Sequence, residues 1–251
     1  MELNSARASV RIDPDLGGRV ASLVVDGNEL LVTGTADSHP MMWGIFPMVP
    51  WAGRVRRARF RYNARSIHLP VNFEPHAIHG TGYAARWSPQ SDGSLTHQFP
   101  DDWPFGGYAV QRFELRDDGL TCTIEVHTGR QPMPAMAGWH PWYRRPVELT
   151  FTAAQMYERD TDHMPNGALV APPPGPWDDC FTDVDQPLHL RWPDGPSLAI
   201  TSSCDHWVIY DEPADALCVE PQTGPPDEFN LTKSHLEPGE SLTAWMRLDW
   251  S

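Results

Sequence analysis

The sequence lacks long helical segments and long apolar segments. Its 26 prolines interrupt most of the chain, and no stretch beyond about a dozen residues is both free of proline and helically periodic. No apolar run approaches the ~20 residues that a membrane-spanning helix needs. The first residues, Met1–Ser5, lack the basic start and the apolar run of a secretory signal. We therefore expect no membrane partner and a soluble, cytoplasmic protein.

Positive charge is also scarce. The chain has 19 Lys and Arg against 33 Asp and Glu, for a formal net charge of −14, which disfavours binding to a phosphate backbone. One arginine-rich segment covers residues 54–62, but Arg57, Arg59 and Arg61 share one strand face in it. Such alternation indicates a solvated strand rather than a nucleic-acid surface. We expect no nucleic-acid partner, while neutral molecules such as sugars remain compatible with this charge.

The common cofactor and nucleophile motifs are missing too. The four cysteines are widely spaced without a CxxC pair, as expected for reduced thiols in a cytoplasmic protein. There is no GxGxxG, P-loop or GxSxG motif. His76, His79 and Asp178 are residue types that bind metals, but their spacing matches no zinc signature. The sequence therefore predicts no cofactor, no metal and no covalent nucleophile.

What the sequence does contain is a series of short strands separated by turns. Residues 108–115 and 120–127 form the clearest hairpin, and its second arm alternates apolar and polar residues. The other expected strands are residues 8–12, 20–25, 29–33, 147–153, 187–192, 197–202, 206–210, 216–220 and 242–250. Residues 41–51 are expected to be buried extended chain, and residues 164–177 a Pro/Gly-rich loop. The pattern predicts an all-β fold, a large antiparallel β-sandwich, with residues 1–251 as one domain.

Glu220 is the first candidate for chemistry. It follows the strand end Cys218-Val219 and precedes Pro221, so its backbone should be extended and stiff. A carboxylate held in this way is suited to act as a general base. The alternative is an ordinary solvated glutamate before a surface loop.

His140 has the same local arrangement, because it precedes Pro141 and lies between Trp139 and Trp142. Its ordinary pKa allows proton transfer near neutral pH, and tryptophan is a suitable wall for a small-ligand pocket. A structural histidine between core tryptophans is the alternative. Glu220 and His140 together would suit the movement of protons on a hydroxylated neutral molecule.

Three further polar side chains stand among glycine, proline and aromatic residues. These are Arg54 in Pro50-Trp51-Ala52-Gly53-Arg54, His79 in His76-Ala77-Ile78-His79-Gly80, and Asp178 in Pro176-Trp177-Asp178-Asp179-Cys180. As donors and acceptors they could orient a polar ligand.

Taken together and in this order, the motifs resemble those of the aldose 1-epimerase (galactose mutarotase) family. The resemblance also includes Gly17-Gly18-Arg19 near the start and Glu220-Pro221-Gln222-Thr223 with Asp227–Asn230 near the end, so that it covers almost the whole chain. It implies the galactose mutarotase type of β-sandwich and a cofactor-independent isomerase that interconverts the α and β anomers of a free aldohexose.

The resemblance also implies roles for the candidate residues. Glu220 would take the proton from the C1 hydroxyl, His140 would protonate the ring oxygen, and Arg54, His79 and Asp178 would bind the sugar. The sequence departs from the family pattern at two positions near the site. Gly53 stands where many relatives carry asparagine, and Asp179 stands where a histidine is common. Glu228 occupies a usually small position.

Two alternatives stay open at this point. Gly82–Trp87 is similar to a segment of hexose-6-phosphate mutarotases of the same fold, in which Arg86 and Arg54 would hold a phosphate. A non-catalytic carbohydrate-binding protein would keep the pocket without the chemistry. The sequence leaves the preferred sugar and the oligomeric state open.

Overall fold

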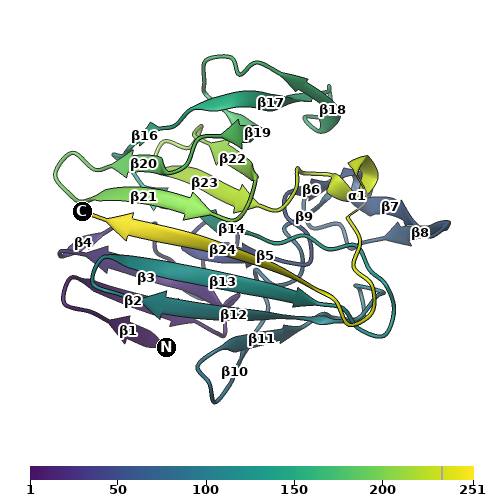
Figure 1. Cartoon of the computed structure of the whole chain (residues 1–251), viewed down its shortest axis with the longest axis horizontal. Helices are drawn as coiled ribbons and strands as arrows, with labels where there is room; N and C mark the ends of the chain where they lie inside the picture. Colours follow the sequence, from purple (N-terminus) through teal and green to yellow (C-terminus); the bar gives the residue numbers. More distant parts are fainter. Residues whose placement is uncertain (233) are drawn as a thin grey trace.

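The computed structural model, which describes residues 1–232 and 234–251, is a sandwich of two antiparallel sheets (Figure 1). The larger sheet has the strand order β1-β2-β3-β5-β14-β23-β22-β19-β17-β18, and β4 pairs with β3 and β15 with β23. Its strands are β1 (Glu2–Asn4), β2 (Ala8–Asp13), β3 (Arg19–Val25), β4 (Asn28–Glu29), β5 (Ile45–Met48), β14 (Gly138–Pro141), β15 (Tyr143–Arg144), β17 (Ala153–Arg159), β18 (Pro165–Val170), β19 (Asp178–Val184), β22 (His206–Tyr210) and β23 (Ala216–Gln222).

The second sheet has the order β10-β11-β12-β13-β24-β21-β20-β16. Its strands are β10 (Ser88–Pro89), β11 (Leu95–Gln98), β12 (Tyr108–Leu115), β13 (Gly119–His127), β16 (Glu148–Thr150), β20 (Leu188–Arg191), β21 (Ser197–Ser202) and β24 (Ser241–Trp250). Two small ribbons are formed by β6 (Arg54–Val55) with β9 (Ala77–Ile78) and by β7 (Arg59–Tyr62) with β8 (Arg65–His68).

Helices are short in the described residues. A 3₁₀ turn covers Arg56–Ala58, and α1 covers Glu228–Leu231. None of these helices is long and apolar enough to cross a membrane. The prediction of an all-β antiparallel sandwich is confirmed.

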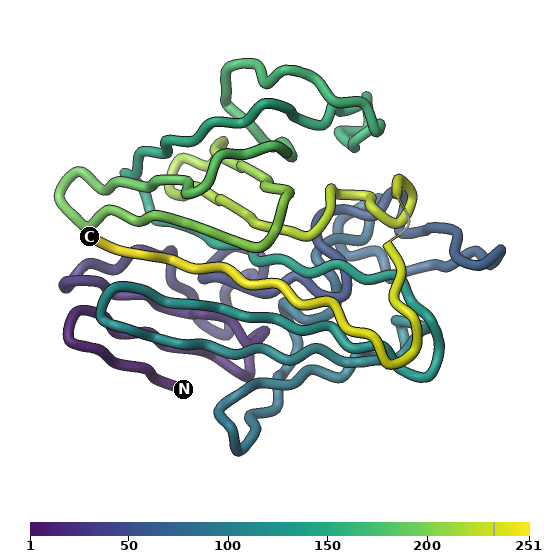
Figure 2. Tube along the Cα trace, in the orientation of Figure 1, coloured from purple at the N-terminus to yellow at the C-terminus, as the bar shows by residue number. Residues whose placement is uncertain are grey.

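Alternating side chains explain the pairing at the centre of the second sheet. In β13 the apolar residues Leu120, Cys122, Ile124 and Val126 are buried, and the residues between them are half-buried. Strand β24 alternates in the same way and pairs with β13 over nine residues, although the two strands are more than a hundred residues apart in sequence (Figure 2). Their apolar faces form one side of the core between the sheets.

The predicted strand over residues 29–33 is wrong in extent. Only Asn28–Glu29 form β4, and Leu31 makes an isolated bridge to Tyr143. The Glu29 carboxylate accepts the backbone N–H groups of Leu23 at 3.0 Å and Leu31 at 3.1 Å. A side chain therefore satisfies backbone groups that a longer strand would have paired.

Two other predictions need correction. The expected strand over residues 147–153 is divided, because β16 ends at Thr150 in the second sheet and β17 begins at Ala153 in the first. The expected loop over residues 164–177 contains β18, whose backbone pairs with β17 at the sheet edge. Its side chains are mostly exposed, so that no apolar alternation marks this strand in the sequence.

Strand β23 also continues beyond the predicted end at Glu220, to Gln222, and all seven of its residues are buried. Glu220 therefore lies within a central strand and not at its end. It is only 3% exposed.

Gly80, next to His79, allows the backbone of residues 80–81 to approach the Val49 carbonyl group closely. Its φ is +75°, and a Cβ at this position would lie 1.9 Å from the Val49 carbonyl oxygen. The same oxygen accepts the Thr81 N–H at 2.7 Å. A side chain on residue 80 would break this contact, in addition to the strain of a left-handed backbone.

We therefore expect Gly80→Ala to lower the melting temperature strongly. Gly93→Ala is the matched control, because Gly93 has a similar φ of +82° but open space around its Cβ position. The control should show only the backbone strain, ~1–2 kcal/mol, and Gly80→Ala should lower the melting temperature at least twice as much. Equal shifts in thermal unfolding would show that the close approach is unimportant.

Candidate active site

The site begins with the register between β14–β15 and β23. Gly138 lies opposite Gln222, and five residues further on Tyr143 lies opposite Leu217. The register is the same at both positions, so the residue two beyond Gly138 falls opposite the residue two before Gln222. These two residues are His140 and Glu220.

The pairing extends this match into a row across the larger sheet. Phe46 in β5 is opposite His140, Val208 in β22 is opposite Glu220, and Cys180 in β19 is opposite Val208. Opposed residues in antiparallel strands project from the same face. His140 and Glu220, 80 positions apart in sequence, are therefore neighbours on one face of the sheet.

That face is directed away from the second sheet. Successive residues of a strand point to opposite sides, and the residues adjoining the row, Trp139, Val219 and Trp207, are fully buried in the hydrophobic core. His140, Glu220, Val208 and Cys180 of this row form the floor of a cavity on the outer face of the larger sheet.

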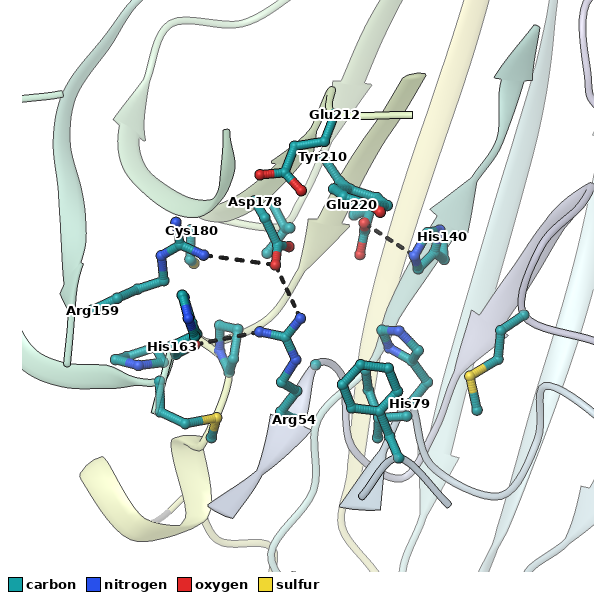
Figure 3. A pocket seen from close by; sticks show the side chains of 18 of the residues that line it. Arg54, His79, His140, Arg159, His163, Asp178, Cys180, Tyr210, Glu212 and Glu220 are labelled. Atoms are coloured by element: carbon teal, nitrogen blue, oxygen red, sulfur yellow. Dashed lines mark hydrogen bonds and ion pairs between the residues drawn. The ribbon is translucent and has the colours of Figure 1, made fainter. Parts of the chain in front are cut away.

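The cavity has a volume of about 450 Å³, within the range of small-molecule sites. Arg54, His79, His140, Asp178 and Glu220 all line it. Figure 3 shows the His140–Glu220 contact on one side of the cavity and the Arg54–Asp178 contact on the other. The structure thus brings together all five residues singled out from the sequence. Met42, Phe73 and Pro226 contribute apolar parts of the wall.

His140 and Glu220 are in direct contact. The distance from His140 Nε2 to Glu220 Oε1 is 3.2 Å, and both side chains are almost fully buried. The imidazole stacks on Phe46, with 4.7 Å between ring centroids, and on Trp142, with 5.3 Å. Its Nδ1 has no hydrogen-bond partner within the described part of the chain. Aromatic packing and the carboxyl group therefore orient this ring.

Burial changes the pKa values of both members of this pair. It raises the pKa of Glu220 well above its ordinary value, and Asp178 adds to this effect while Arg54 opposes it. Burial also lowers the pKa of His140 to about 3. Both shifts disfavour the charged forms, so that burial favours a neutral carboxyl group next to a neutral imidazole.

His79 and Arg54 complete the wall around this pair. The His79 ring stands edge-on to His140 at 5.0 Å, and burial lowers its pKa well below the ordinary value, with smaller contributions from His140 and Arg54. His79 is therefore neutral at physiological pH. Arg54 donates from Nη2 to Asp178 Oδ2 at 2.9 Å and lies over the Phe73 ring at 5.2 Å.

Sequence reasoning missed Arg159, the last residue of β17, which also lines the cavity. Its Nε is 2.7 Å from Asp179 Oδ1, and its Nη2 donates to Asp179 Oδ2 at 3.3 Å. Its Nη1 lies 3.7 Å from Asp178 Oδ2. Asp178 thus faces the cavity, whereas Asp179 is buried behind Arg159 and fixes its guanidinium. Arg159 and Asp179 belong to the paired strands β17 and β19, and no local motif in the sequence indicates their contact.

The other residues noted in the sequence lie outside the cavity wall or shape it indirectly. Arg86 does not line the cavity, and its Nε is 3.0 Å from Asp15 Oδ1 with both side chains largely exposed. Glu228 is buried at the start of α1, where it accepts a hydrogen bond from the Thr232 hydroxyl. Gly53 lines the cavity, and a Cβ there would lie 2.8 Å from Pro226.

Of the three metal-binding residue types considered in the sequence, His79 and Asp178 line the cavity and His76 does not. His76 lies elsewhere, where its Nδ1 accepts the Arg57 N–H at 3.1 Å. Within residues 1–232 and 234–251, the group of His, Cys, Asp and Glu side chains with ligand spacing is His140, Cys218 and Glu220. One ligand atom of each lies within 4.8 Å of the other two.

Comparison with known proteins finds similar proteins that match almost the whole chain. The uncharacterized protein YphB of Escherichia coli is 27% identical over 284 residues, which cover 98% of both chains. The structure is similar to that of a galactose mutarotase-like protein from Clostridium acetobutylicum, with a TM-score of 0.88 at 18% identity and coverage of 100% and 94% of the two chains. It is also similar to a galactose 1-epimerase from Lactobacillus acidophilus, with a TM-score of 0.84 at 16% identity and coverage of 99% and 92%.

The family model described as aldose 1-epimerase matches residues 2–249. That match takes in both sheets and every residue of the cavity wall named above. The chain therefore belongs to the aldose 1-epimerase family.

Proposed function

We propose that this protein is a cofactor-independent aldose 1-epimerase that interconverts the α and β anomers of a free aldohexose. The observation that carries the proposal is the 3.2 Å contact between His140 and Glu220 on the floor of a cavity of about 450 Å³. Ring opening of a hexose needs one group that takes the proton of the C1 hydroxyl and another that gives a proton to the ring oxygen. Glu220 is the base and His140 the acid.

The two groups share one proton, and its position decides which state is active. Before a sugar binds, burial favours the neutral pair. A sugar hydroxyl that donates to Glu220 stabilises the carboxylate, as Arg54 already does. The proton then moves across the short contact to His140 Nε2, from where it passes to the ring oxygen. Reclosure after rotation of the aldehyde group returns both protons and gives the other anomer.

The charges around the cavity favour a neutral sugar over a phosphorylated one. Two arginines face the cavity, but Asp178 pairs with Arg54 and Asp179 with Arg159. Glu212 adds a further carboxylate to the wall. A phosphate site needs cationic donors that are free to bind it. Arg86, which the alternative would require, pairs with Asp15 away from the cavity.

The remaining polar side chains position the sugar. Arg54, His79 and Asp178 come from three different segments and surround the Glu220–His140 pair (Figure 3). Arg159 adds a fourth group, which Asp179 holds in place. Such positioning lowers the barrier because the reacting atoms are already aligned with the acid and the base.

We also propose that the protein works in the cytoplasm. All four cysteines are unpaired and buried, which is the usual state of thiols in a reducing compartment.

Glu220→Gln tests the base. The substitution keeps the shape of the side chain but removes proton transfer, so anomer exchange should fall by at least ~100-fold. The melting temperature should hardly change, since burial already disfavours the charged carboxylate. Polarimetry on freshly dissolved α-glucose and α-galactose measures the rate.

Glu228→Gln is the matched control, because Glu228 is a buried carboxylate outside the cavity wall. It should leave the rate unchanged. Residual activity above a tenth of wild type in Glu220→Gln would contradict the assignment of the base. A wild-type protein that binds sugars without accelerating mutarotation would instead be a carbohydrate-binding protein.

The preference for a neutral sugar can be tested with glucose and glucose 6-phosphate side by side. We expect faster anomer exchange by NMR for glucose and no acceleration for the phosphate, because the arginines of the wall are already paired with carboxylates. Preferential turnover of glucose 6-phosphate would favour the hexose-6-phosphate mutarotase alternative.

Asp179→Asn tests the positioning of Arg159. We expect KM to rise ~10-fold, the equivalent of 1.4 kcal/mol, with a smaller change in kcat, since Arg159 holds the bound sugar both before and during ring opening. Arg159→Met should have a similar effect, and the double variant should be no worse than Arg159→Met alone.

Asp162→Asn is the control for this series. Asp162 is a half-exposed carboxylate that pairs with Arg56 at 3.2 Å outside the cavity wall. The KM of the Asp162→Asn variant should therefore stay at the wild-type value. Additive effects of Asp179→Asn and Arg159→Met would mean that the two residues act independently.

A further inference from the structure

The strand register that pairs His140 with Glu220 also brings a thiol to the same place. Cys218 lies two residues before Glu220 in β23, so both side chains project from the same face. It is opposite Tyr210 in β22, and the register with β14–β15 places it opposite Trp142. Cys218 is fully buried.

We propose that His140, Cys218 and Glu220 form a binding site for one thiophilic divalent cation, such as Zn²⁺ or Cd²⁺, and that the bound ion blocks the acid–base pair. Each residue offers one ligand atom, and the three atoms lie within 4.8 Å of one another. Bonds of 2.0–2.3 Å to zinc place its ligand atoms roughly 3.3–3.8 Å apart. Side-chain shifts of roughly 1 Å would therefore close the site around an ion.

The chemistry of the three ligands selects the class of ion. A thiolate, an imidazole nitrogen and a single carboxylate suit Zn²⁺ and Cd²⁺, whereas Mg²⁺ and Ca²⁺ prefer sites made of oxygen atoms. The catalytic site of many zinc enzymes likewise has three protein ligands and an open position. Here the fourth position would face the cavity and take a water molecule.

The charges of the complex also fit a buried location. The ion brings two positive charges, and the Cys218 thiolate and the Glu220 carboxylate bring one negative charge each, so the complex is neutral. The Cys218 proton and the proton shared by Glu220 and His140 leave to the solvent. A neutral assembly avoids the large cost of placing a net charge where all three side chains are buried.

The consequence for activity rests on the proposed function. An ion on His140 Nε2 and a Glu220 oxygen occupies the lone pairs that would accept and pass protons. The ion would therefore act as an inhibitor, and anomer exchange would require that the ion is displaced by the sugar or dissociates.

Binding can be measured without any turnover, by titrating the metal-free protein with Cd²⁺ and following the ultraviolet charge-transfer band of the cadmium–thiolate bond. We expect a band that saturates at one ion per chain in wild type and is absent in Cys218→Ser and Cys218→Ala. Cys180→Ser is the matched control, because Cys180 lines the cavity in the same sheet but is not one of the three ligands. It should keep the band.

Absence of the band in wild type, or its persistence in folded Cys218→Ser or Cys218→Ala, would overturn the site. Thermal unfolding identifies which of the two substitutions is folded. In the second arm, Zn²⁺ should inhibit anomer exchange by wild type, and the folded Cys218 variant should need at least ~10-fold more ion. Equal inhibition of both proteins, or activation by Zn²⁺, would overturn the blocking role, whereas a protein that binds Cd²⁺ but exchanges no anomers would refute the proposed function alone.

Discussion

The site depends on the register between β14–β15 and β23. A slip of one residue would turn His140 into the core and bring Trp139 to the cavity floor, because the side chains of a strand alternate between its faces. Neighbouring ladders hold the register on both sides: β14 pairs with β5 over four residues, and β23 with β22 over five. The contact between a carboxyl group and an imidazole is thus set by backbone hydrogen bonds rather than by a local motif.

Burial then gives this contact its electrostatic character. Glu220 and His140 lie where neither charge is well solvated. Burial therefore raises the pKa of Glu220 and lowers the pKa of His140, which favours the neutral form of each. On the opposite wall, Arg54 and Arg159 are balanced by Asp178 and Asp179. The cavity therefore offers many hydrogen-bonding groups but little free charge, which suits a molecule rich in hydroxyl groups.

Local patterns in the sequence predicted the parts of the molecule that local physics determines. Alternation identified the hairpin of β12 with β13 and strand β24, and stiff X–Pro contexts drew attention to His140 and Glu220. The edge strand β18 was missed because its side chains are mostly exposed and show no apolar alternation. The end of β23 was missed because Gln222 pairs with Gly138, which is distant in sequence. Arg159 was missed for the same reason, since only its contact with Asp179 across two strands gives it a place in the cavity wall.

Charge neutrality links the proposed catalysis with the proposed metal site. Burying a charged group costs little free energy only when nearby charges cancel its own. In the proposed reaction a neutral sugar would satisfy this condition, because the proton that His140 gives to the ring oxygen is matched by the one that Glu220 takes from the C1 hydroxyl. A divalent ion satisfies it as well, because Cys218 supplies the second negative charge. The thiol beside the proposed acid–base pair is therefore the feature that would make this cavity sensitive to thiophilic metals. Replacing it with a hydroxyl would remove that sensitivity while leaving Glu220 and His140 in place.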